Sequence, residues 1–468
     1  MTPTPIAFGT SGWRGILGDE FTCFNLRRVT RAVARYFCQE IPVRQPTIFV
    51  GFDTRFLSEH LAHEVVAVLA AEGVKPVLST TFTPTPALAH TVLHRKFDGG
   101  INLTASHNPA EYSGIKLSTR DGAPAPSEVT RRIESLLNEI RDGSAPPPLP
   151  ASKVKTLDPA PEYRKAVLKH VRSKVIARAR LKLVCDPVNG TGSGYLPPLL
   201  SPAKSLFTIR AHRDVTFGGH PPDCTEKELS PLIQEVRRRQ AHLGLATDGD
   251  ADRFGVVDRG GRFVPPNWVL ALIADYLLET REPRLGIART VATTRLLDDV
   301  AASHSVPLFE TPVGFKYIGQ LIDEDKVSIG GEESAGLSIR NHFPEKDGIL
   351  ACLLVAEMVA RRGVSLKEML EQVYSEVGRI VNGRIGVRLT PELQQGLASK
   401  LAGGAESFGG RRVVSVNRVD GAKFILEDGS WILMRPSGTE PLVRIYAEAS
   451  NEQELEVLLE SGRKYILG

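Results

Sequence analysis

The sequence predicts an α/β protein made of three α/β units and a smaller α+β unit at the C-terminus. Three observations support this fold class. The chain has 468 residues, more than one hydrophobic core can organise. Short apolar, β-branched runs alternate with helical periodicity through most of the chain, which is typical of mixed, mostly parallel sheets with helices on both faces. The last segment is instead rich in strands, with an Asp-Gly turn pair in a predicted hairpin at residues 417–436.

The first unit, at residues 1–150, illustrates the alternation. The strand-like run "TIFVGFD" precedes the helical pattern "SEHLAHEVVAVLAAEG", and "KPVLST" precedes "TPALAHTVLHRK". The Pro-rich segment "DGSAPPPLPASK" at residues 142–153 interrupts this pattern, and we place the first domain boundary there. The pattern then returns twice, which predicts two further α/β domains at residues 151–254 and 255–376, and the strand-rich remainder predicts the α+β domain at residues 377–468.

One recurrence links the three α/β units. The segments "GGINLTASHNP", "LGLATDGDADR" and "VSIGGEESAG" are each a small apolar strand that runs into a polar loop. Open α/β sheets bind ligands at the carboxyl ends of their parallel strands. We therefore expect the three loops to face a shared cleft.

The composition is that of a soluble globular protein, with 42% hydrophobic residues, 24% charged residues and a net charge of +4. This mild charge does not favour a nucleic-acid or acidic-membrane partner. No apolar run approaches the ~20 residues of a membrane helix, and the N-terminus lacks a signal pattern. Five scattered cysteines without a Cys-x-x-Cys pair indicate reduced thiols rather than a zinc site. We expect a cytoplasmic protein that binds neither nucleic acid nor membrane.

The loop "DGDADR" carries the sharpest chemical signal. In an extended segment, Asp248, Asp250 and Asp252 point the same way, and three anions so close together repel one another. A hard divalent cation relieves that repulsion, and oxygen-only ligation suits magnesium. The loop lacks the glycine and glutamate spacing of an EF-hand, whereas Arg253 could pair with a phosphate. An acidic surface turn is the alternative interpretation.

Ser106, in "TASHNP", is a candidate nucleophile that needs a base or a metal to act. The surrounding residues lack the G-x-S-x-G setting of an esterase. With a cation nearby, a phosphoserine is plausible, because the cation neutralises phosphate charge during transfer. Taken alone, the loop fits a strand-end cap better, with His107 and Asn108 orienting it.

Two further loops suggest phosphate and sugar contacts. "RPSGTEP", from Arg435 to Pro441, combines a guanidinium, two hydroxyls and a glycine, which suits a phosphate cradle. "GGEESAG" places Glu332 and Ser334 two residues apart, which suits adjacent sugar hydroxyls. Ordinary glycine turns explain either loop singly. "NGTGSG" has Tyr195 where a dinucleotide fingerprint needs glycine, so we interpret it as a turn.

Together these loops resemble the α-D-phosphohexomutase superfamily, and most closely its phosphoglucomutase/phosphomannomutase members. The resemblance covers essentially the whole chain, with seven motifs in the family's order: "GTSGWRG", "TASHNP", "DGDADR", "TPVGFK", "GGEESAG", "PEKDG" and "RPSGTEP". It implies four domains around a central cleft, three α/β and a last one α+β. Their implied contributions are, in order, the phosphoserine, the metal site, the sugar contacts and a phosphate site.

The resemblance also implies roles for individual residues. Ser106 would be the phosphorylated serine, and it would bind one Mg²⁺ per chain together with Asp248, Asp250 and Asp252. Lys116, Arg14 and His107 match positions near the reacting phosphate, with Lys116 as the preferred acid/base group. The implied substrate contacts are Arg253 to the phosphoserine, Glu332 and Ser334 to the sugar 3- and 4-hydroxyls, Lys316 and Lys346 along the cleft, and Arg435, Ser437, Gly438 and Thr439 to the non-reacting phosphate.

The implied activity is a two-step phosphoryl shuttle between glucose 1-phosphate and glucose 6-phosphate, with glucose 1,6-bisphosphate as intermediate and activator. The "GEES" form, with Ala335 and Gly336 after it, departs from the "GEMSGH" and "GEQSGH" of related subfamilies and is nearer to glucose-directed members. Mannose phosphates are the expected second substrate. The alternatives are a phosphomannomutase, a phosphopentomutase, a magnesium phosphatase or a silent sugar-phosphate sensor. The sequence leaves monomer and homodimer open.

Overall fold

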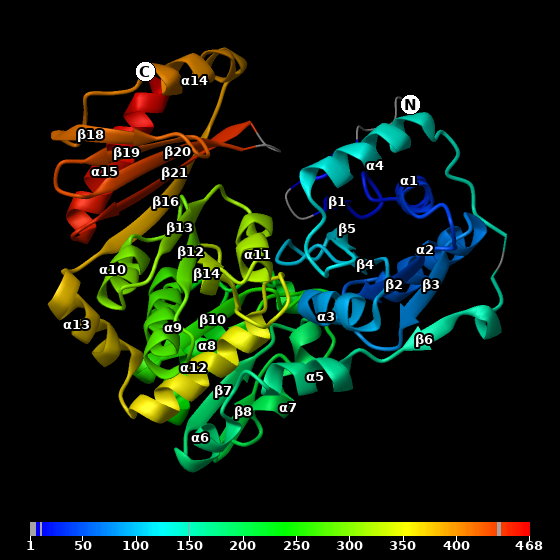
Figure 1. Cartoon of the computed structure of the whole chain (residues 1–468), viewed down its shortest axis with the longest axis horizontal. Coiled ribbons are helices and arrows are strands. Elements are labelled where there is room, and N and C mark those ends of the chain that lie inside the picture. Colours follow the sequence, from blue (N-terminus) through cyan, green and yellow to red (C-terminus); the bar gives the residue numbers. More distant parts are fainter. Residues whose placement is uncertain (1–5, 10–11, 148, 438–440) are drawn as a thin grey trace.

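The computed structural model describes residues 6–9, 12–147, 149–437 and 441–468, and these fold around four sheets (Figure 1). We name domains I to IV after these sheets in chain order. The first three sheets are mixed and accompanied by helices, whereas the fourth is antiparallel. The predicted fold class of three α/β domains and one α+β domain is confirmed. None of the helices in the described ranges has the length and apolarity needed to cross a bilayer.

Domain I contains a six-stranded sheet of order β1-β5-β4-β2-β3-β6, parallel from β4 to β6 and antiparallel at β1 and β5. Its strands are β1 (Trp13–Ile16), β2 (Thr47–Phe52), β3 (Lys75–Ser79), β4 (Gly99–Leu103), β5 (Tyr112–Thr119) and β6 (Lys155–Leu157). Its helices are α1 (Cys23–Glu40), α2 (Ser58–Ala71), α3 (Thr85–Arg95) and α4 (Ser127–Glu139).

Domain II contains a five-stranded sheet of order β11-β10-β9-β7-β8. Its strands are β7 (Lys182–Asp186), β8 (Ser205–Thr208), β9 (Leu243–Thr247), β10 (Phe254–Asp258) and β11 (Arg262–Val264). Its helices are α5 (Ala160–Leu168), α6 (Ser173–Arg178), α7 (Leu196–Leu200) and α8 (Ser230–Arg239).

Domain III contains a four-stranded sheet of order β13-β12-β14-β15. Its strands are β12 (Gly286–Thr290), β13 (Leu308–Thr311), β14 (Val327–Glu332) and β15 (Gly336–Ile339). Its helices are α9 (Pro266–Thr280), α10 (Leu296–Ser303), α11 (Phe315–Asp323), α12 (Gly348–Arg362) and α13 (Leu366–Val377).

Domain IV contains an antiparallel sheet of order β16-β21-β20-β19-β18-β17. Its strands are β16 (Val381–Arg388), β17 (Ser407–Phe408), β18 (Arg411–Asn417), β19 (Ala422–Leu426), β20 (Trp431–Pro436) and β21 (Leu442–Ala449), and its helices are α14 (Pro391–Gly403) and α15 (Glu452–Leu467). Gly421 and Gly429 close the two turns around β19 with φ of +83° and +82°, a region that favours glycine. The predicted hairpin is therefore β19–β20, with a further turn before it.

The three polar loops occupy equivalent places in their sheets. Each follows a strand that pairs in parallel with its inner neighbour, namely β4, β9 or β14, and each leads into an antiparallel partner, β5, β10 or β15. The loops thus leave the carboxyl ends of strands, where open α/β sheets place ligands.

The hydrophobic cores do not follow the four sheets one to one. Domains I and IV have cores of their own, whereas domains II and III share one, in which Leu245 of β9 and Ile287 of β12 belong to the same buried cluster. Strand β6 lies beyond the predicted boundary at residue 150, yet it pairs with β3 of domain I. The exact domain limits stay a prediction.

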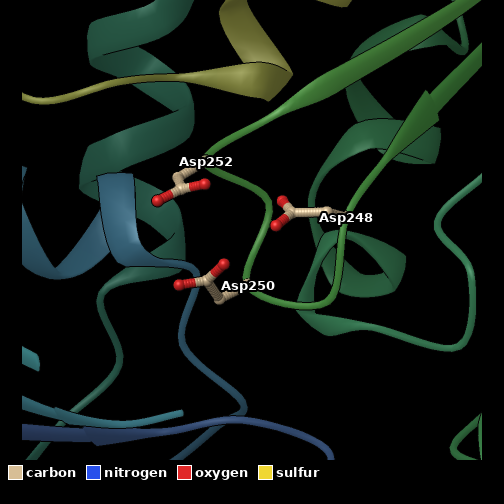
Figure 2. Close-up of side chains that lie close together, drawn as sticks. All are labelled: Asp248, Asp250 and Asp252. Carbon is tan, nitrogen blue, oxygen red and sulfur yellow. The ribbon is translucent and has the colours of Figure 1, made fainter. Parts of the chain in front are cut away.

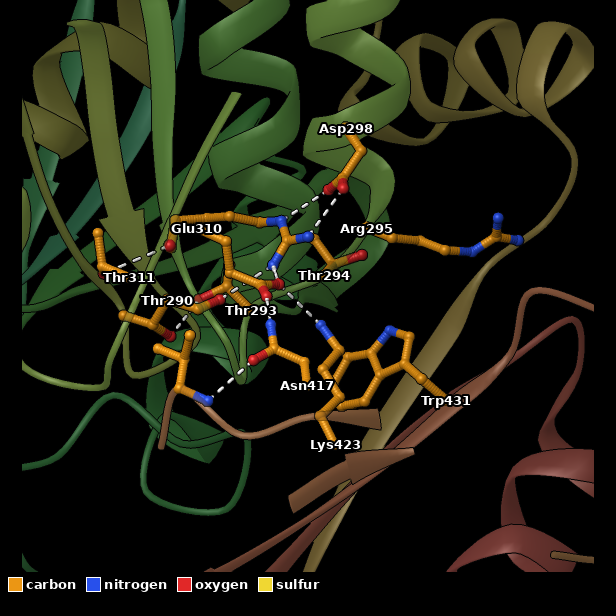
Figure 3. A network of polar contacts seen from close by, with 12 residues as sticks. Thr290, Thr293, Thr294, Arg295, Asp298, Glu310, Thr311, Asn417, Lys423 and Trp431 are labelled. Atoms are coloured by element: carbon orange, nitrogen blue, oxygen red, sulfur yellow. Dashed lines mark hydrogen bonds and ion pairs between the residues drawn. The ribbon is translucent and has the colours of Figure 1, made fainter. Parts of the chain in front are cut away.

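A polar network joins domain III to domain IV (Figure 3). Glu310 of β13 accepts hydrogen bonds from Arg289 of domain III and from Asn417 and Lys423 of domain IV, with Lys423 Nζ at 3.0 Å. The Lys423 ammonium also lies 4.3 Å from the Trp431 ring centroid. One carboxylate therefore compensates two cations from two domains.

We expect Glu310→Gln to lower the free energy of unfolding by about 2 kcal/mol, because Arg289 and Lys423 lose their shared counter-ion. The cost is smaller than for a fully enclosed pair, since the Glu310 side chain is 21% exposed. Urea denaturation measures the change. Glu371→Gln, which breaks an exposed pair with Arg379, is the control and should stay within about 0.5 kcal/mol. Equal effects of the two substitutions would contradict this account.

Candidate functional site

The site is built around three aspartates in the loop between β9 and β10. Asp248, Asp250 and Asp252 are at most 1% exposed, and one carboxylate oxygen of each lies within 4.8 Å of the others. Figure 2 shows the three side chains pointing toward one another. Within the described ranges, Oδ1 of Asp250 and Oδ1 of Asp252 are buried without a hydrogen-bond partner. Converging, unpartnered carboxylate oxygens fit a hard divalent cation.

Two lysines compensate part of this negative charge. Lys116 Nζ of β5 lies 2.6 Å from Asp250 Oδ2 and 2.7 Å from Asp252 Oδ2, and Lys346 Nζ lies 3.2 Å from Asp252 Oδ2. Burial lowers the pKa of Lys116, but the two carboxylates outweigh it and the net shift is upward. Lys116 is therefore an ammonium at neutral pH.

The carboxylates respond in opposite directions. Burial and then the charges of Asp252 and Asp250 raise the pKa of Asp248 well above its usual value. Burial also acts to raise the pKa of Asp252, but Lys116 and Lys346 lower it by more. The negative charge of Asp248 is therefore energetically unfavourable in this site, and a bound cation would stabilise it.

Ser106 lies directly against this acidic cluster. Its hydroxyl donates a hydrogen bond to Asp248 Oδ2 at 2.8 Å, and the residue is 1% exposed. Its backbone has a φ of +51°, which is uncommon for a residue other than glycine, and its N–H donates to Thr104 Oγ1. A Cβ on Gly249 would meet the Ser106 carbonyl oxygen at 2.4 Å, so the serine and aspartate loops touch.

Arg14, His107 and Arg253 surround the serine. Arg14 Nη1 donates to Asn108 Oδ1 at 2.6 Å, and His107 Nδ1 lies 3.4 Å from Ser106 Oγ. Burial, then Arg253 and Arg14, lower the pKa of His107, which keeps its imidazole neutral. Burial opposes the charge of Arg253, but Asp223 and Asp248 raise its pKa overall. The serine hydroxyl therefore has both acidic and cationic neighbours.

Lys346 lies between the predicted sugar loop and the aspartates, because it packs against Gly336 and pairs with Asp252. Glu332 ends β14, its Oε1 accepts the Gly314 N–H at 3.1 Å, and burial raises its pKa. Ser334 is half-buried in the turn that follows. A Cβ on Gly336 would lie 2.3 Å from Lys346 Cδ, so only glycine leaves room for that side chain. The packing of Lys346 thus explains why glycine stands at residue 336, where the related subfamilies have histidine.

Other predicted residues lie outside this cluster. Lys316 Nζ donates to Ser127 Oγ of domain I at 2.6 Å. Arg435 Nε donates to Asp420 Oδ2 at 2.7 Å, and the same carboxylate accepts the Val313 N–H at 3.0 Å. The Ser437 N–H donates to the Leu442 carbonyl. Gly438 and Thr439 lie outside the described residues.

The motifs did not single out Thr85, which supports a metal-site aspartate. At the start of α3, its N–H donates to the Asp250 carbonyl at 2.9 Å, and its hydroxyl donates to Asp250 Oδ2. Asn102 Nδ2 of β4 donates in turn to Thr85 Oγ1 at 3.2 Å. A Thr-Pro pair at a helix start is the only sequence signal, and it predicts a cap rather than a site residue.

Four family domains match the chain in order, each described as part of phosphoglucomutase/phosphomannomutase. They are alpha/beta/alpha domain I over residues 5–144, domain II over residues 161–261, domain III over residues 265–377 and the C-terminal domain over residues 391–461.

Similar proteins match over almost their whole length. A Thermococcus kodakarensis phosphoglucomutase/phosphomannomutase is 32% identical over 98% of both chains. A Sulfurisphaera tokodaii phosphoglucosamine/phosphogalactosamine mutase is 29% identical over 98% of this chain and 99% of its own. A crystal structure from Thermus thermophilus, described as a candidate phosphomannomutase, is 33% identical, covers 100% of both chains and has a TM-score of 0.87.

Glu345, next to Lys346, provides a pH test of the burial at this site. Burial raises its pKa to about 7, above the ~4.3 of an unfolded chain. The folded protein therefore binds the Glu345 proton more tightly, and that contribution to stability is lost as pH rises from about 4.3 through 7.

The glutamine side chain of the Glu345→Gln variant is neutral at every pH, so the stability of the variant does not change with the titration of this residue. We expect the free energy of unfolding of the variant, relative to that of the unsubstituted protein, to rise by about 3 kcal/mol between pH 4 and pH 8. Urea denaturation at several pH values measures the difference. A difference that stays constant over this range would show that Glu345 does not titrate as described.

Proposed function

This chain belongs to the phosphoglucomutase/phosphomannomutase family, and we propose that it interconverts glucose 1-phosphate and glucose 6-phosphate through a phosphorylated Ser106. It is a hexose phosphate mutase, an enzyme of intramolecular phosphoryl transfer. The serine, the sugar preference and the activator glucose 1,6-bisphosphate are the parts that we propose.

The hydrogen bond from Ser106 Oγ to Asp248 carries the proposal. Phosphoryl transfer requires positioning and neutralisation of phosphate charge more than covalent assistance from the protein. Here a buried hydroxyl lies against a candidate cation site, with Lys116 bound to the same aspartates. A strand-end cap does not require these neighbours.

One Mg²⁺ would be held by Asp248, Asp250, Asp252 and the Ser106 side chain. When bound, it would neutralise negative charge on the phosphate of Ser106. The two unpartnered Oδ1 atoms and the raised pKa of Asp248 support this assignment. Lys116 and Lys346 keep part of the same charge balanced from two other domains.

The cations around Ser106 would act on the transferring group. Arg14 and Arg253 would bind its oxygens, and Lys116, an ammonium, would donate a proton or hydrogen bond rather than accept one. His107 is neutral and would hold the loop. These roles follow from charge and position.

The remaining residues would bind the part of the substrate that does not react. Glu332, Ser334 and Lys346 would contact the sugar, which is consistent with the buried position of Glu332 beside Gly314. The non-reacting phosphate would be bound in domain IV by Arg435, Ser437, Gly438 and Thr439, and Lys316 would line the substrate cleft. An arginine and backbone donors recognise charge and shape, so they accept a 1- or a 6-phosphate alike.

The reaction would proceed in two transfers. Phospho-Ser106 gives its phosphoryl group to the free hydroxyl of a hexose monophosphate, and the serine is left as a hydroxyl. The bisphosphate turns end for end, and Ser106 then takes the other phosphoryl group. Water must be excluded while the bisphosphate turns, so domain IV is expected to close over the cleft.

Glucose phosphates are the proposed main substrate, with mannose phosphates second. The support is the sequence "GEES" at residues 331–334, which is nearer to the sequence of glucose-directed members of the family. Glucose and mannose differ only at C2, whereas the predicted grip is on the 3- and 4-hydroxyls. A relative at 29% identity is named for amino sugars. Rates with glucose, mannose, glucosamine and ribose 1-phosphates therefore decide the preference.

Ser106→Ala tests the proposed nucleophile. With Mg²⁺ and a trace of glucose 1,6-bisphosphate, the unsubstituted protein should form glucose 6-phosphate and carry a mass adduct of about 80 Da on Ser106. The variant should lose at least ~10³-fold in kcat and carry no adduct, because no hydroxyl remains to accept the phosphoryl group.

Ser118→Ala is the matched control, because Ser118 is a buried serine of β5 in the same domain and has no assigned role. It should keep both activity and adduct. Undiminished turnover of Ser106→Ala, or an adduct on another residue, would contradict the assignment. Inorganic phosphate released in step with substrate loss would instead indicate a phosphatase.

A further inference from the structure

Arg55 is a buried arginine whose guanidinium holds the serine loop from beneath. It follows β2 and is 1% exposed. Its Nε–H donates to Asp53 Oδ2 at 3.1 Å. The four N–H groups of Nη1 and Nη2 donate to backbone carbonyls of the loop, those of Ser106, Asn108, Pro109 and Tyr112, at 2.6 to 3.0 Å.

These four carbonyls span the segment that carries the nucleophile. Ser106 has a φ of +51°, a conformation that costs free energy for any residue with a Cβ. Its carbonyl accepts Arg55 Nη2 at 2.8 Å and lies against Gly249 of the aspartate loop. The hydrogen bond from Arg55 therefore fixes the peptide that directs Ser106 Oγ toward Asp248.

The guanidinium is itself held on several sides. Asp53 is 1% exposed, and its Oδ1 accepts the Ser58 hydroxyl at 2.7 Å and the Arg55 N–H at 3.0 Å. The Phe217 ring of domain II lies 5.0 Å from the guanidinium carbon. Arg213, also of domain II, donates to the Arg55 carbonyl at 3.1 Å. The guanidinium is thus held by Asp53 and Phe217, and the Arg55 backbone is bound by Asp53 and Arg213.

The geometry excludes a direct phosphate-binding role for Arg55. All five of its guanidinium N–H groups donate to Asp53 or to loop carbonyls. A guanidinium has only five such donors. In this respect Arg55 differs from Arg14, which donates to a side chain at the edge of the serine loop.

We propose that Arg55 is a positioning residue that holds the backbone of residues 106–112 so that the Ser106 hydroxyl faces Asp248. The inference rests on the proposed role of Ser106 as the group that carries the phosphate. Arg55 acts through the loop, so its loss should slow phosphoryl transfer to and from Ser106 without weakening the binding of the sugar phosphate.

The test compares Arg55→Lys with Arg28→Lys in the full-length protein. Lysine keeps the charge but offers one nitrogen instead of the planar fork. Arg28 is a suitable control because it is also buried in domain I, at 5% exposed, and also donates to a backbone carbonyl, that of Ile140. Single-turnover incorporation of phosphate from glucose 1,6-bisphosphate, followed by intact mass, is the primary readout.

Arg55→Lys should slow incorporation by about 100-fold, the cost of a nucleophile displaced by about 1 Å. The KM for glucose 1-phosphate should stay within about threefold, since its binding contacts are retained. Arg28→Lys should change neither quantity by more than about threefold. Equal incorporation rates for Arg55→Lys and the unsubstituted protein would overturn the inference, as would a loss confined to KM.

Ser58→Ala provides a milder variant if Arg55→Lys does not fold. It removes one hydrogen bond to Asp53 and should slow incorporation by about fivefold at unchanged KM. No effect on the rate would count against the inference. The unsubstituted protein distinguishes failure of the proposed function from failure of the role of Arg55. If it incorporates no phosphate at Ser106, the proposed function is wrong. If it and Arg55→Lys both incorporate phosphate at the normal rate, only the role of Arg55 is wrong.

Discussion

The hydrogen bond between Ser106 and Asp248 joins the two loops on which the site depends. Three aspartates are withdrawn from water beside it, and burying such anions is unfavourable unless cations compensate them. Lys116 from domain I and Lys346 from domain III supply part of that compensation to a loop of domain II. Charge balance therefore requires all three α/β domains to be in place at once.

The fold delivers these groups by repeating one arrangement. In each α/β domain, a polar loop connects a strand with parallel pairing to an antiparallel neighbour. Domains II and III also share a core, which fixes the aspartate loop relative to the loop that contains Glu332 and Ser334. Domain IV is attached to domain III through polar contacts at Glu310 and Asp420 and through a small apolar cluster that includes Val291 and Trp431. This partly polar interface rearranges more readily than the large apolar core that domains II and III share, which suits a domain expected to close over the cleft.

The sequence predicted the fold class because strand and helix periodicity and the Asp-Gly turns are local signals. It also singled out Asp248, Asp250 and Asp252 by their spacing, and Ser106 through the resemblance to the family, as candidates that the structure brings together. Strand β6 was not assigned to domain I, because its pairing with β3 depends on contacts across a Pro-rich segment. Thr85 and Arg55 were missed because their roles arise from burial beside loops distant in the sequence. The packing reason for Gly336 required the position of Lys346.

We propose that Asp248, Asp250, Asp252 and phosphorylated Ser106 bind one divalent cation between them. Anomalous diffraction from crystals of the Ser106-phosphorylated protein grown with Mn²⁺ tests this most directly. One strong peak is expected within about 2.3 Å of an oxygen from each of Asp248, Asp250, Asp252 and the Ser106 phosphate. A peak bound elsewhere, or carboxylates turned away from the serine into solvent, would contradict it.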